Sequence, residues 1–515
     1  MVNAAVGGRT TSLLDPLLLA TVAILGSLSL LLAFVGDGSI ALTLSPLALA
    51  LVILAATRVP LRWSLLVLAF LSLTLENPSE APAMHRWRSP LYTLGALLLT
   101  HMNVTLPVKE LIFSGLDLAL VLFAAVWAVR RMSGSRVDLG GHIPPAPPLR
   151  SAALLCLACI ALVWLHGAVR DGFSFGDSLW QVFRVVYLPS VFLLFCAALR
   201  GPVDTRAAGV VLMLAALVRA SLAIYLRLRF PDVDFLPHAT THADSMLFSD
   251  AVLLVLVVFF ERPTRRNLAL AACTIPLFVW GMIANNRRLV WVELGLSLAV
   301  IYFITPMTRL KRRIAQGFVV LLPVLILYRA AGWNSGSSLF APVRTLRSVV
   351  DSESDTSTLW RDWENYNLYV TWKANPILGT GFGHEYTEVV KLPDISTAYA
   401  LYRYAPHNSI LGLLAYSGPI GFLGIWLIIP LGLLLAIRTY RRSVTPADRS
   451  AALACMGVLV AYVVHCYGDM GLGTWTSVFT VGGALAIVAK QAVATGAWPL
   501  TPRSPWAPEE NLDLR

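Results

Sequence analysis

The stretch YAPHNSILGLLAYSGPIGFLGIW, residues 404–426, places an imidazole directly before a long apolar segment. Pro406 precedes His407, and Asn408 and Ser409 are residue types that commonly cap a helix N-terminus. We therefore expect His407 at the start of a helix, where the positive end of the helix dipole favours the neutral imidazole. A neutral imidazole can accept a proton near neutral pH, as a general base does. A structural hydrogen bond at the membrane interface is the alternative role.

Two adjacent arginines form a second group that could do chemistry. Arg287 and Arg288 stand in ANNRRLVWVELGL at the start of an apolar segment, on the side of the membrane where positive charge is disfavoured. A planar guanidinium suits phosphate, so the pair predicts a bound anion, with snorkelling into lipid headgroups as the alternative. Arg184 and Arg219 are related candidates in apolar runs, for which function and structural ion pairing are both open.

The segment between these two groups is rich in aromatic residues. Residues 358–386 read TLWRDWENYNLYVTWKANPILGTGFGHEY. The aromatic side chains recur every three or four positions, at Trp360, Trp363, Tyr366, Tyr369 and Trp372. This spacing predicts an amphipathic helix that ends at the Asn-Pro pair of residues 375–376. Its aromatic face could hold a sugar, with core packing or interfacial anchoring as the alternative.

Glycines follow this helix, and acidic residues lie within it. Gly379, Gly381 and Gly383 permit a tight backbone path, which is typical of a turn and only a weak sign of phosphate binding. Asp362 and Glu364 are alternatives to His407 as the base.

The composition assigns the chain to the membrane proteins. Of its 515 residues, 57% are hydrophobic and 13% are charged, whereas a soluble domain carries about 25% charged residues. Apolar runs of roughly 20 residues, the length that spans a bilayer, recur along nearly the whole chain and predict about 12–14 transmembrane helices. In lipid every backbone group must be satisfied within the helix, so the expected fold class is an all-α polytopic membrane protein.

Basic clusters indicate the orientation of these helices under the positive-inside rule. VRRMSGSR, ERPTRRN, MTRLKRR and IRTYRRS each lie between apolar runs. The segments expected in the cytoplasm are both termini and residues 130–150, 200–206, 261–267, 307–313 and 438–449. The segments expected outside are residues 77–111, 170–182, 228–247, 285–288, 332–408 and 467–473.

This map predicts four regions. Residues 1–331 form N-terminal transmembrane helices, and residues 332–408 form a large extracytoplasmic loop that caps the membrane domain. Residues 409–490 form C-terminal transmembrane helices, and the Pro-rich residues 491–515 form a disordered cytoplasmic tail. The first apolar run lacks an Ala-x-Ala cleavage site, so we expect it to remain as a span rather than to be removed as a signal peptide.

Several function classes are excluded or disfavoured. The net charge of +11 is concentrated between apolar runs, which argues against nucleic-acid binding. The six cysteines lie inside or at the end of apolar runs and are expected to act as small core residues. No Gly-x4-Gly-Lys-[Ser/Thr] sequence occurs, which excludes ATP-driven transport through a P-loop of this chain.

Three stretches, in this order, resemble the O-antigen ligase and polymerase superfamily of bacterial envelopes. NNRRLVWVEL resembles the family's arginine-bearing helix start after a short outer turn. RDWENYNLYVTWKANPILGTGFGHEY is similar to a segment of the family's large periplasmic loop, and HNSILGLLAYSGPIGFLG to its histidine-bearing signature. Together they span about residues 285–426. The three stretches in this order are a more specific sign of the family than any one of them alone.

The resemblance implies an inverting membrane glycosyltransferase of GT-C type that needs no metal ion or other cofactor. Such an enzyme transfers a glycan from undecaprenyl pyrophosphate to a hydroxyl of lipid A-core or of another glycan. It acts at the periplasmic face of the bacterial inner membrane in lipopolysaccharide or exopolysaccharide biosynthesis. Its expected partners are the donor, the acceptor, the lipid bilayer and other polysaccharide assembly proteins.

The resemblance also implies residue roles. His407 matches the family's essential histidine, Arg287 or Arg288 its pyrophosphate-binding arginine, and Arg361 its loop arginine. A second arginine and Asn286 stand where the family has a serine and a small residue, so the equivalent of the first arginine is open. The residues expected to bind substrate are Asn408, Arg184, Arg219, Trp363, Gly379 and Gly381.

Other functions remain open at this point. The shared motif does not separate a polymerase, which joins repeat units, from a ligase, which passes a finished glycan to a terminal acceptor. A transporter or flippase of lipid-linked sugars should carry internal repeats with broken helices, and none is visible between the two halves. A purely structural membrane subunit would leave the outer arginines and the Trp-rich loop without a role.

Overall fold

The chain folds as an all-α membrane protein, as expected. The computed structural model describes residues 16–36, 38, 43–51, 59–78, 90–105, 112–132, 142–233, 235–335, 340, 343, 347, 356–396 and 401–499. Within these ranges the only β-type pairing is an isolated bridge between His101 and Ser114. The helices are α1 (Pro16–Val35), α3 (Leu61–Thr74), α4 (Pro90–Leu99), α5 (Met102–Thr105), α6 (Gly115–Met132), α7 (Pro147–Ala168), α8 (Phe175–Ala198), α9 (Pro202–Arg229), α10 (His242–Glu261), α11 (Arg265–Asn285), α12 (Leu289–Ile304), α13 (Arg309–Gly332), α15 (Thr356–Ala374), α16 (Ser409–Trp426), α17 (Ile428–Arg442), α18 (Pro446–Gly468) and α19 (Trp475–Ala494), with a short 3-10 helix η5 (Gly471–Gly473).

The described part of the chain contains nine helical segments that are long and apolar enough to cross a bilayer. One of them, residues 409–442, combines α16 and α17. Four shorter apolar helices accompany them, including α3 and α12. The structure thus describes fewer helices of full spanning length than the 12–14 expected, and part of the remaining apolar sequence forms these shorter helices.

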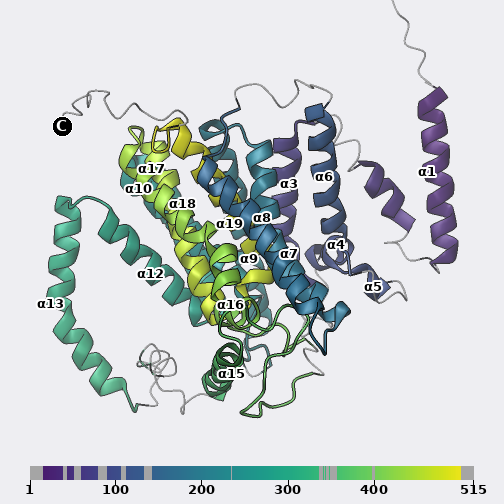
Figure 1. The fold of residues 1–515 in the computed structure, drawn as a ribbon. Coiled ribbons are helices and arrows are strands. Elements are labelled where there is room, and N and C mark those ends of the chain that lie inside the picture. Colours follow the sequence, from purple (N-terminus) through teal and green to yellow (C-terminus); the bar gives the residue numbers. More distant parts are fainter. Residues whose placement is uncertain are drawn as a thin grey trace, which may run out of the picture.

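The bundle is built around three helices that are mostly buried, α10, α18 and α19. α10 packs against α18 and α11, α18 against α12 and α17, and α19 against α8. The outer helices α1 and α13 stand apart from this bundle on opposite sides (Figure 1). The apolar window of α13 has no buried residue, so its surface is left to lipid.

One end of the bundle carries α15, which lies beyond the end of α16 (Figure 1); we call it the α15 end. Segments that the charge pattern predicts on the outer side meet there. The backbone N–H of Ser174 donates to the carbonyl of Gly383 at 3.0 Å, and the Gln181 amide donates to the carbonyl of Tyr404 at 2.8 Å. These contacts tie the α7–α8 connection to the loop that follows α15.

The segments predicted in the cytoplasm meet at the opposite end. The backbone N–H of Ile143 donates to the carbonyl of Arg200 at 2.8 Å, and Arg449 forms an ion pair with Glu261 at 3.1 Å. Each of these four contacts joins segments that the charge pattern predicts on the same side of the membrane.

The ends of α13, α16 and α19 can be compared with the four predicted regions. α13 ends at Gly332 and α16 begins at Ser409, next to the predicted limits of the large loop. The sequence places the start of the C-terminal tail at residue 491, whereas α19 continues to Ala494. Residues 500–515 of that tail lie outside the described residues.

Candidate functional site

The turn between α11 and α12 positions the arginine pair. Asn286 ends α11 in the left-handed conformation (φ 53°), which asparagine tolerates better than most residues. Its neighbour Asn285 is fully buried. The Asn285 side chain accepts from the backbone N–H of Thr240 at 2.7 Å and donates to the hydroxyl of Ser245 at 2.7 Å. The two asparagines therefore hold the end of α11 against the start of α10.

Of the two arginines, Arg287 faces the bundle. Its guanidinium contacts Nε2 of His242, the first residue of α10, while Arg288 is exposed at the start of α12. Nδ1 of His242 lies 3.2 Å from a carboxylate oxygen of Asp469, just beyond α18. A proton on Nδ1 satisfies Asp469 and leaves Nε2 to accept from Arg287. The ends of α10, α11 and α18 thus hold the guanidinium of Arg287 in place.

The charges in this cluster act on one another. Burial lowers the pKa of Arg287 to about 10; Arg361 acts in the same direction, and Asp469 opposes it. Burial alone would raise the pKa of Asp469, yet its interactions with His242 and Arg361 contribute to lowering it to about 2. Burial and the charge of Arg287 lower the pKa of His238 to about 4. Arg287 therefore lies among the Arg361 guanidinium and two carboxylates, Asp469 and Asp244.

The predicted helix of the large loop is α15, and it ends one residue before Asn375 as expected. Its buried face is polar rather than aromatic: Glu364, Asn367 and Thr371 are buried. Trp360, Tyr366 and Tyr369 are exposed, while Trp363 and Trp372 are partly covered. Leu368 is buried as well, and of the aromatic residues Trp372 packs against the same core cluster.

Arg361 lies on α15, close enough to Arg287 to interact with it electrostatically. Its charge acts on Arg287, His242 and Asp469. Its side chain is partly buried and makes no hydrogen bond or ion pair with the described residues. Two cationic groups from distant parts of the chain thus act on one another at the α15 end.

His407 stands directly before α16, as the sequence predicts. Asn408 is the N-cap residue, and its side chain accepts from the backbone N–H of Leu411 at 3.1 Å. Nδ1 of His407 lies 3.3 Å from Oε1 of Glu364 on α15. The hydroxyl of Ser409 donates to the backbone carbonyl of Asp469 at 3.2 Å. These contacts bring the start of α16 to both α15 and the end of α18.

The glycine segment after α15 packs on a kink in α16. Pro419 has no N–H, and Gly418 adopts φ 59° and ψ 178°, so the helical hydrogen bonds are interrupted there. The freed carbonyl of Ala415 accepts from the backbone N–H of Thr380 at 3.1 Å, and that of Tyr416 accepts from Gly381 at 2.8 Å.

These glycines are buried at points of close approach. A Cβ at Gly379 would collide with the backbone of Tyr416, and one at Gly381 with Gly167 of α7. The packing accounts for both glycines as contacts between the loop and the helices. Their predicted contact with substrate stays a prediction.

The other candidates differ in their surroundings. Arg219 is buried on α9, where its Nε donates to Asp244 at 2.7 Å and its guanidinium lies 3.9 Å from Glu76. Two carboxylates thus balance this arginine, which supports the structural alternative. Arg184 on α8 packs against Gly473 of η5. The structure does not join Arg219 to the His407 contacts.

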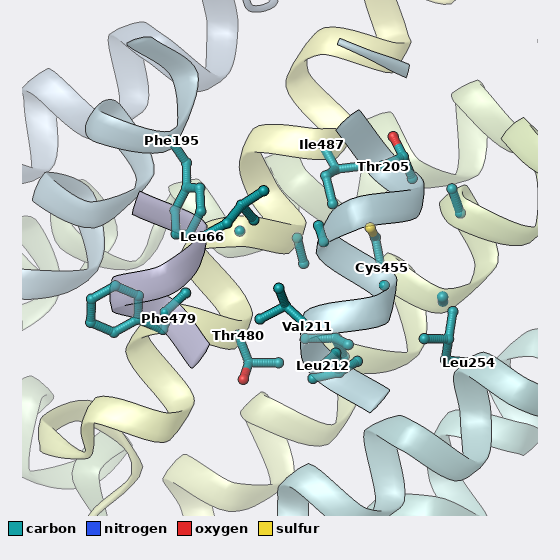
Figure 2. A pocket seen from close by; sticks show the side chains of 18 of the residues that line it. Leu66, Phe195, Thr205, Val211, Leu212, Leu254, Cys455, Phe479, Thr480 and Ile487 are labelled. Carbon is teal, nitrogen blue, oxygen red and sulfur yellow. The ribbon is translucent and has the colours of Figure 1, made fainter. Parts of the chain in front are cut away.

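Two further features bear on ligand binding. Within the described ranges, no group of three or more His, Cys, Asp or Glu side chains lies where it could hold a metal ion. A cavity of about 100 Å³ is lined almost wholly by apolar side chains between α3, α9, α18 and α19. Figure 2 shows Val211, Phe479 and Ile487 among its lining residues. None of the site residues lines it.

The sequence does not predict that His242 and Asp469 belong to the site, and it suggests a different role for Glu364. His242 and Asp469 carried no motif, although both stand at helix ends in segments assigned to the outer side. Glu364 was considered only as an alternative base, whereas its carboxylate contacts His407. The signal that could have found them is charge in outer segments directly beside apolar runs.

Residues 273–426 match the Wzy_C family model, described as O-antigen ligase. This part of the chain is similar to the O-antigen ligase domain. The match covers less than half of the chain, supports the resemblance to the O-antigen ligase and polymerase superfamily, and includes Arg287, Arg361, Glu364 and His407. No curated protein matches the chain significantly. The domain match indicates a glycosyl-transfer enzyme with a ligase-like or polymerase-like role.

Proposed function

We propose that this protein transfers a glycan from undecaprenyl pyrophosphate to a hydroxyl acceptor at the periplasmic face of the inner membrane. The acceptor is lipid A-core or another glycan repeat unit. The observation that carries the proposal is the meeting of three helix starts or faces at the α15 end. Arg361 of α15 acts electrostatically on Arg287, and Glu364, three residues after Arg361, contacts His407, so α15 links segments that lie up to 120 positions apart in the sequence.

The two arginines would hold the pyrophosphate of the donor. Arg361 makes no ion pair with the described residues, and the lowered pKa of Arg287 shows that burial disfavours its charge. A dianionic pyrophosphate would neutralise both guanidiniums, and its oxygens can accept pairs of hydrogen bonds from the planar guanidinium. His242 would keep Arg287 in place through Nε2.

His407 would act on the acceptor. As the acceptor oxygen attacks the anomeric carbon, its proton passes to the imidazole, and the bond from that carbon to the pyrophosphate oxygen breaks. The electron pair leaves with the pyrophosphate, where preorganised guanidiniums stabilise the developing charge. Attack from the face opposite the leaving group inverts the anomeric configuration.

The transfer is proposed to need no metal ion, since the arginines supply the positive charge. The chain does carry an Asp-x-Asp pair, Asp232 and Asp234, in a segment assigned to the outer side. Asp234 lies outside the described residues. A chelator is therefore an essential part of the test.

The test is a transfer assay with the full chain in nanodiscs, supplied with undecaprenyl pyrophosphate-linked glycan and EDTA. We expect product from the wild type, and a loss of at least about 100-fold in His407→Ala and in Arg287→Ala. Arg288→Ala is the matched control, because the side chain is exposed, and we expect it to stay within about fivefold of the wild type. A ladder of products identifies a polymerase, and a single shift identifies a ligase.

Several outcomes would contradict the proposal. Product that requires a divalent cation would rule out the metal-independent step. Full activity of His407→Ala would remove the assigned base. Glycan that is bound or moved across the bilayer without a new glycosidic bond would support a transporter instead.

A further inference from the structure

One carboxylate binds both the backbone and the ring of His407. Oε2 of Glu364 accepts from the backbone N–H of His407 at 3.1 Å, and Oε1 lies 3.3 Å from Nδ1. The Glu364 side chain is only 5% exposed, whereas that of His407 is 31% exposed. The two oxygens of Glu364 are thus engaged by one residue, and the histidine is the member of the pair that a substrate can reach.

The carboxylate is itself held in place by the helix that carries it. Asn408 donates to the side chain of Asn365 at 3.0 Å, beside the Glu364 contact. Three residues further along α15, the buried Asn367 accepts from the backbone N–H groups of Val389 and Val390 at 3.0 and 2.9 Å. α15 is therefore fixed to the loop that follows it and to the start of α16, so Glu364 has little freedom to move.

This geometry decides which nitrogen of His407 is available. A carboxylate facing Nδ1 requires the proton to be on Nδ1 in the neutral ring, which leaves the lone pair on Nε2. A base that is oriented by a third group in this way is a recurrent arrangement in catalysis. The same carboxylate would stabilise the imidazolium that forms when Nε2 takes a proton.

We propose that Glu364 is a positioning residue that fixes the orientation and tautomer of His407, so that Nε2 receives the proton of the acceptor hydroxyl. This inference rests on the proposed transfer reaction and deepens it. Nε2 gains the proton as the acceptor oxygen bonds to the anomeric carbon and the pyrophosphate leaves with the electron pair. The imidazolium then releases that proton to water.

The first experiment compares Glu364→Gln, Glu364→Asp and Glu364→Ala with the wild type in the transfer assay in nanodiscs. We expect Glu364→Gln to lower kcat about 100-fold with KM for the lipid-linked donor unchanged, since the amide no longer fixes the tautomer. Glu364→Asp keeps the charge and should recover part of kcat. Glu385→Gln is the matched control, because Glu385 is a half-exposed carboxylate 3.6 Å from Arg403, and its kcat should stay within about twofold.

A double-mutant cycle separates positioning from a merely structural role. If Glu364 acts through His407, adding Glu364→Gln to His407→Ala should lower kcat no further. Additive losses, or a wild-type kcat in Glu364→Gln, would overturn the inference. Thermal unfolding of each variant in detergent identifies loss of folding, and the isosteric glutamine keeps the test open if the alanine variant unfolds.

The inference and the proposed function fail in different ways. Loss of activity in His407→Ala together with full activity in Glu364→Gln removes only the role of Glu364. Full activity in His407→Ala removes the base itself, and the positioning role fails with it.

Discussion

At the scale of single residues, the α15 end brings charged side chains close together. The charge of Arg361 contributes to lowering the pKa of Arg287, and the Asp469 carboxylate interacts electrostatically with both arginines. Arg287 reaches the cluster because Asn286 can adopt the left-handed conformation that turns the chain between α11 and α12. Arg288, one position further, is directed to the exterior. The proposed specificity for an anion thus depends on which of two neighbouring arginines the turn directs inward.

The lowered pKa of Asp469 gives a pH dependence. Because its folded pKa of about 2 lies below the usual value near 4, the unfolded chain binds the proton more readily. Asp469 therefore adds stability of about 2 kcal/mol above pH 4, and this contribution is lost as the pH falls from about 4 to about 2. We expect the wild type to be more stable than Asp469→Asn at pH 7, with the difference shrinking at pH 3.

Thermal unfolding of both proteins in the same detergent at several pH values provides the measurement. The difference between them isolates Asp469 from the other carboxyl groups that titrate in this range. A difference that stays constant from pH 7 to pH 3 would show that the carboxylate charge contributes nothing.

At the scale of helices, α12 and α18 are joined by a buried ion pair beneath the site. Nδ1 of His465 lies 2.9 Å from Oε1 of Glu293, and each side chain is only 1% exposed. Glu293 follows Arg287 by six positions, and His465 precedes Asp469 by one helical turn. The pair therefore ties together the two helices whose ends hold Arg287 and Asp469.

Removal of one partner should be costly. We expect His465→Leu to lower the free energy of unfolding by about 3–5 kcal/mol, because it leaves the Glu293 carboxylate buried without its partner. The double variant Glu293→Leu/His465→Leu should recover most of this loss, since no buried charge remains. Chemical unfolding of the two variants in detergent compares them, and equal losses in both would contradict the ion-pair account.

The kink in α16 is a second feature of this scale. We expect Gly418→Ala to lower the melting temperature and the transfer activity, because a Cβ there would collide with the carbonyl of Ile377 and the backbone has φ 59°. Gly295→Ala in α12 is the matched control, since nothing lies within 4 Å of its added Cβ. This alanine should be neutral or stabilise the helix by up to about 1 kcal/mol.

Melting curves and the transfer assay test the pair of glycine variants. If both variants behave alike, the kink does not need glycine. The glycine-rich residues 379–383, which pack on this kink, would then require another explanation.

At the scale of the whole molecule, the two ends of the bundle should face opposite sides of the membrane. We expect Glu385→Cys at the α15 end to react with a membrane-impermeant maleimide from the periplasm of spheroplasts. Val444→Cys at the opposite end should react only after the membrane is opened, because the basic residues near α17 favour the cytoplasm. The wild type is the control, since its six thiols lie within apolar helices.

Labelling of both positions from the same side would contradict the orientation. Labelling of Val444→Cys alone in intact spheroplasts would invert it and place the site in the cytoplasm.

The sequence by itself determined the membrane class, and it predicts the grouping of loops and the segments that carry the candidate site. These properties follow from composition, from charge beside apolar runs and from motifs within one stretch of chain. His407 before a helix, Asn408 as its cap and the helix that precedes Asn375 could all be predicted, because each depends on residues only a few positions away.

Only the tertiary structure decided which side chains meet. It distinguished Arg287 from Arg288, paired Arg219 with Asp244, and brought His242 to Asp469 and Glu364 to His407. The burial of Asn367 on α15 also depends on the tertiary structure, because the side chain accepts from backbone N–H groups of the loop that follows α15. These contacts join residues tens to hundreds of positions apart, and local spacing does not specify how helices pack. Their packing fixes the chemistry of the site.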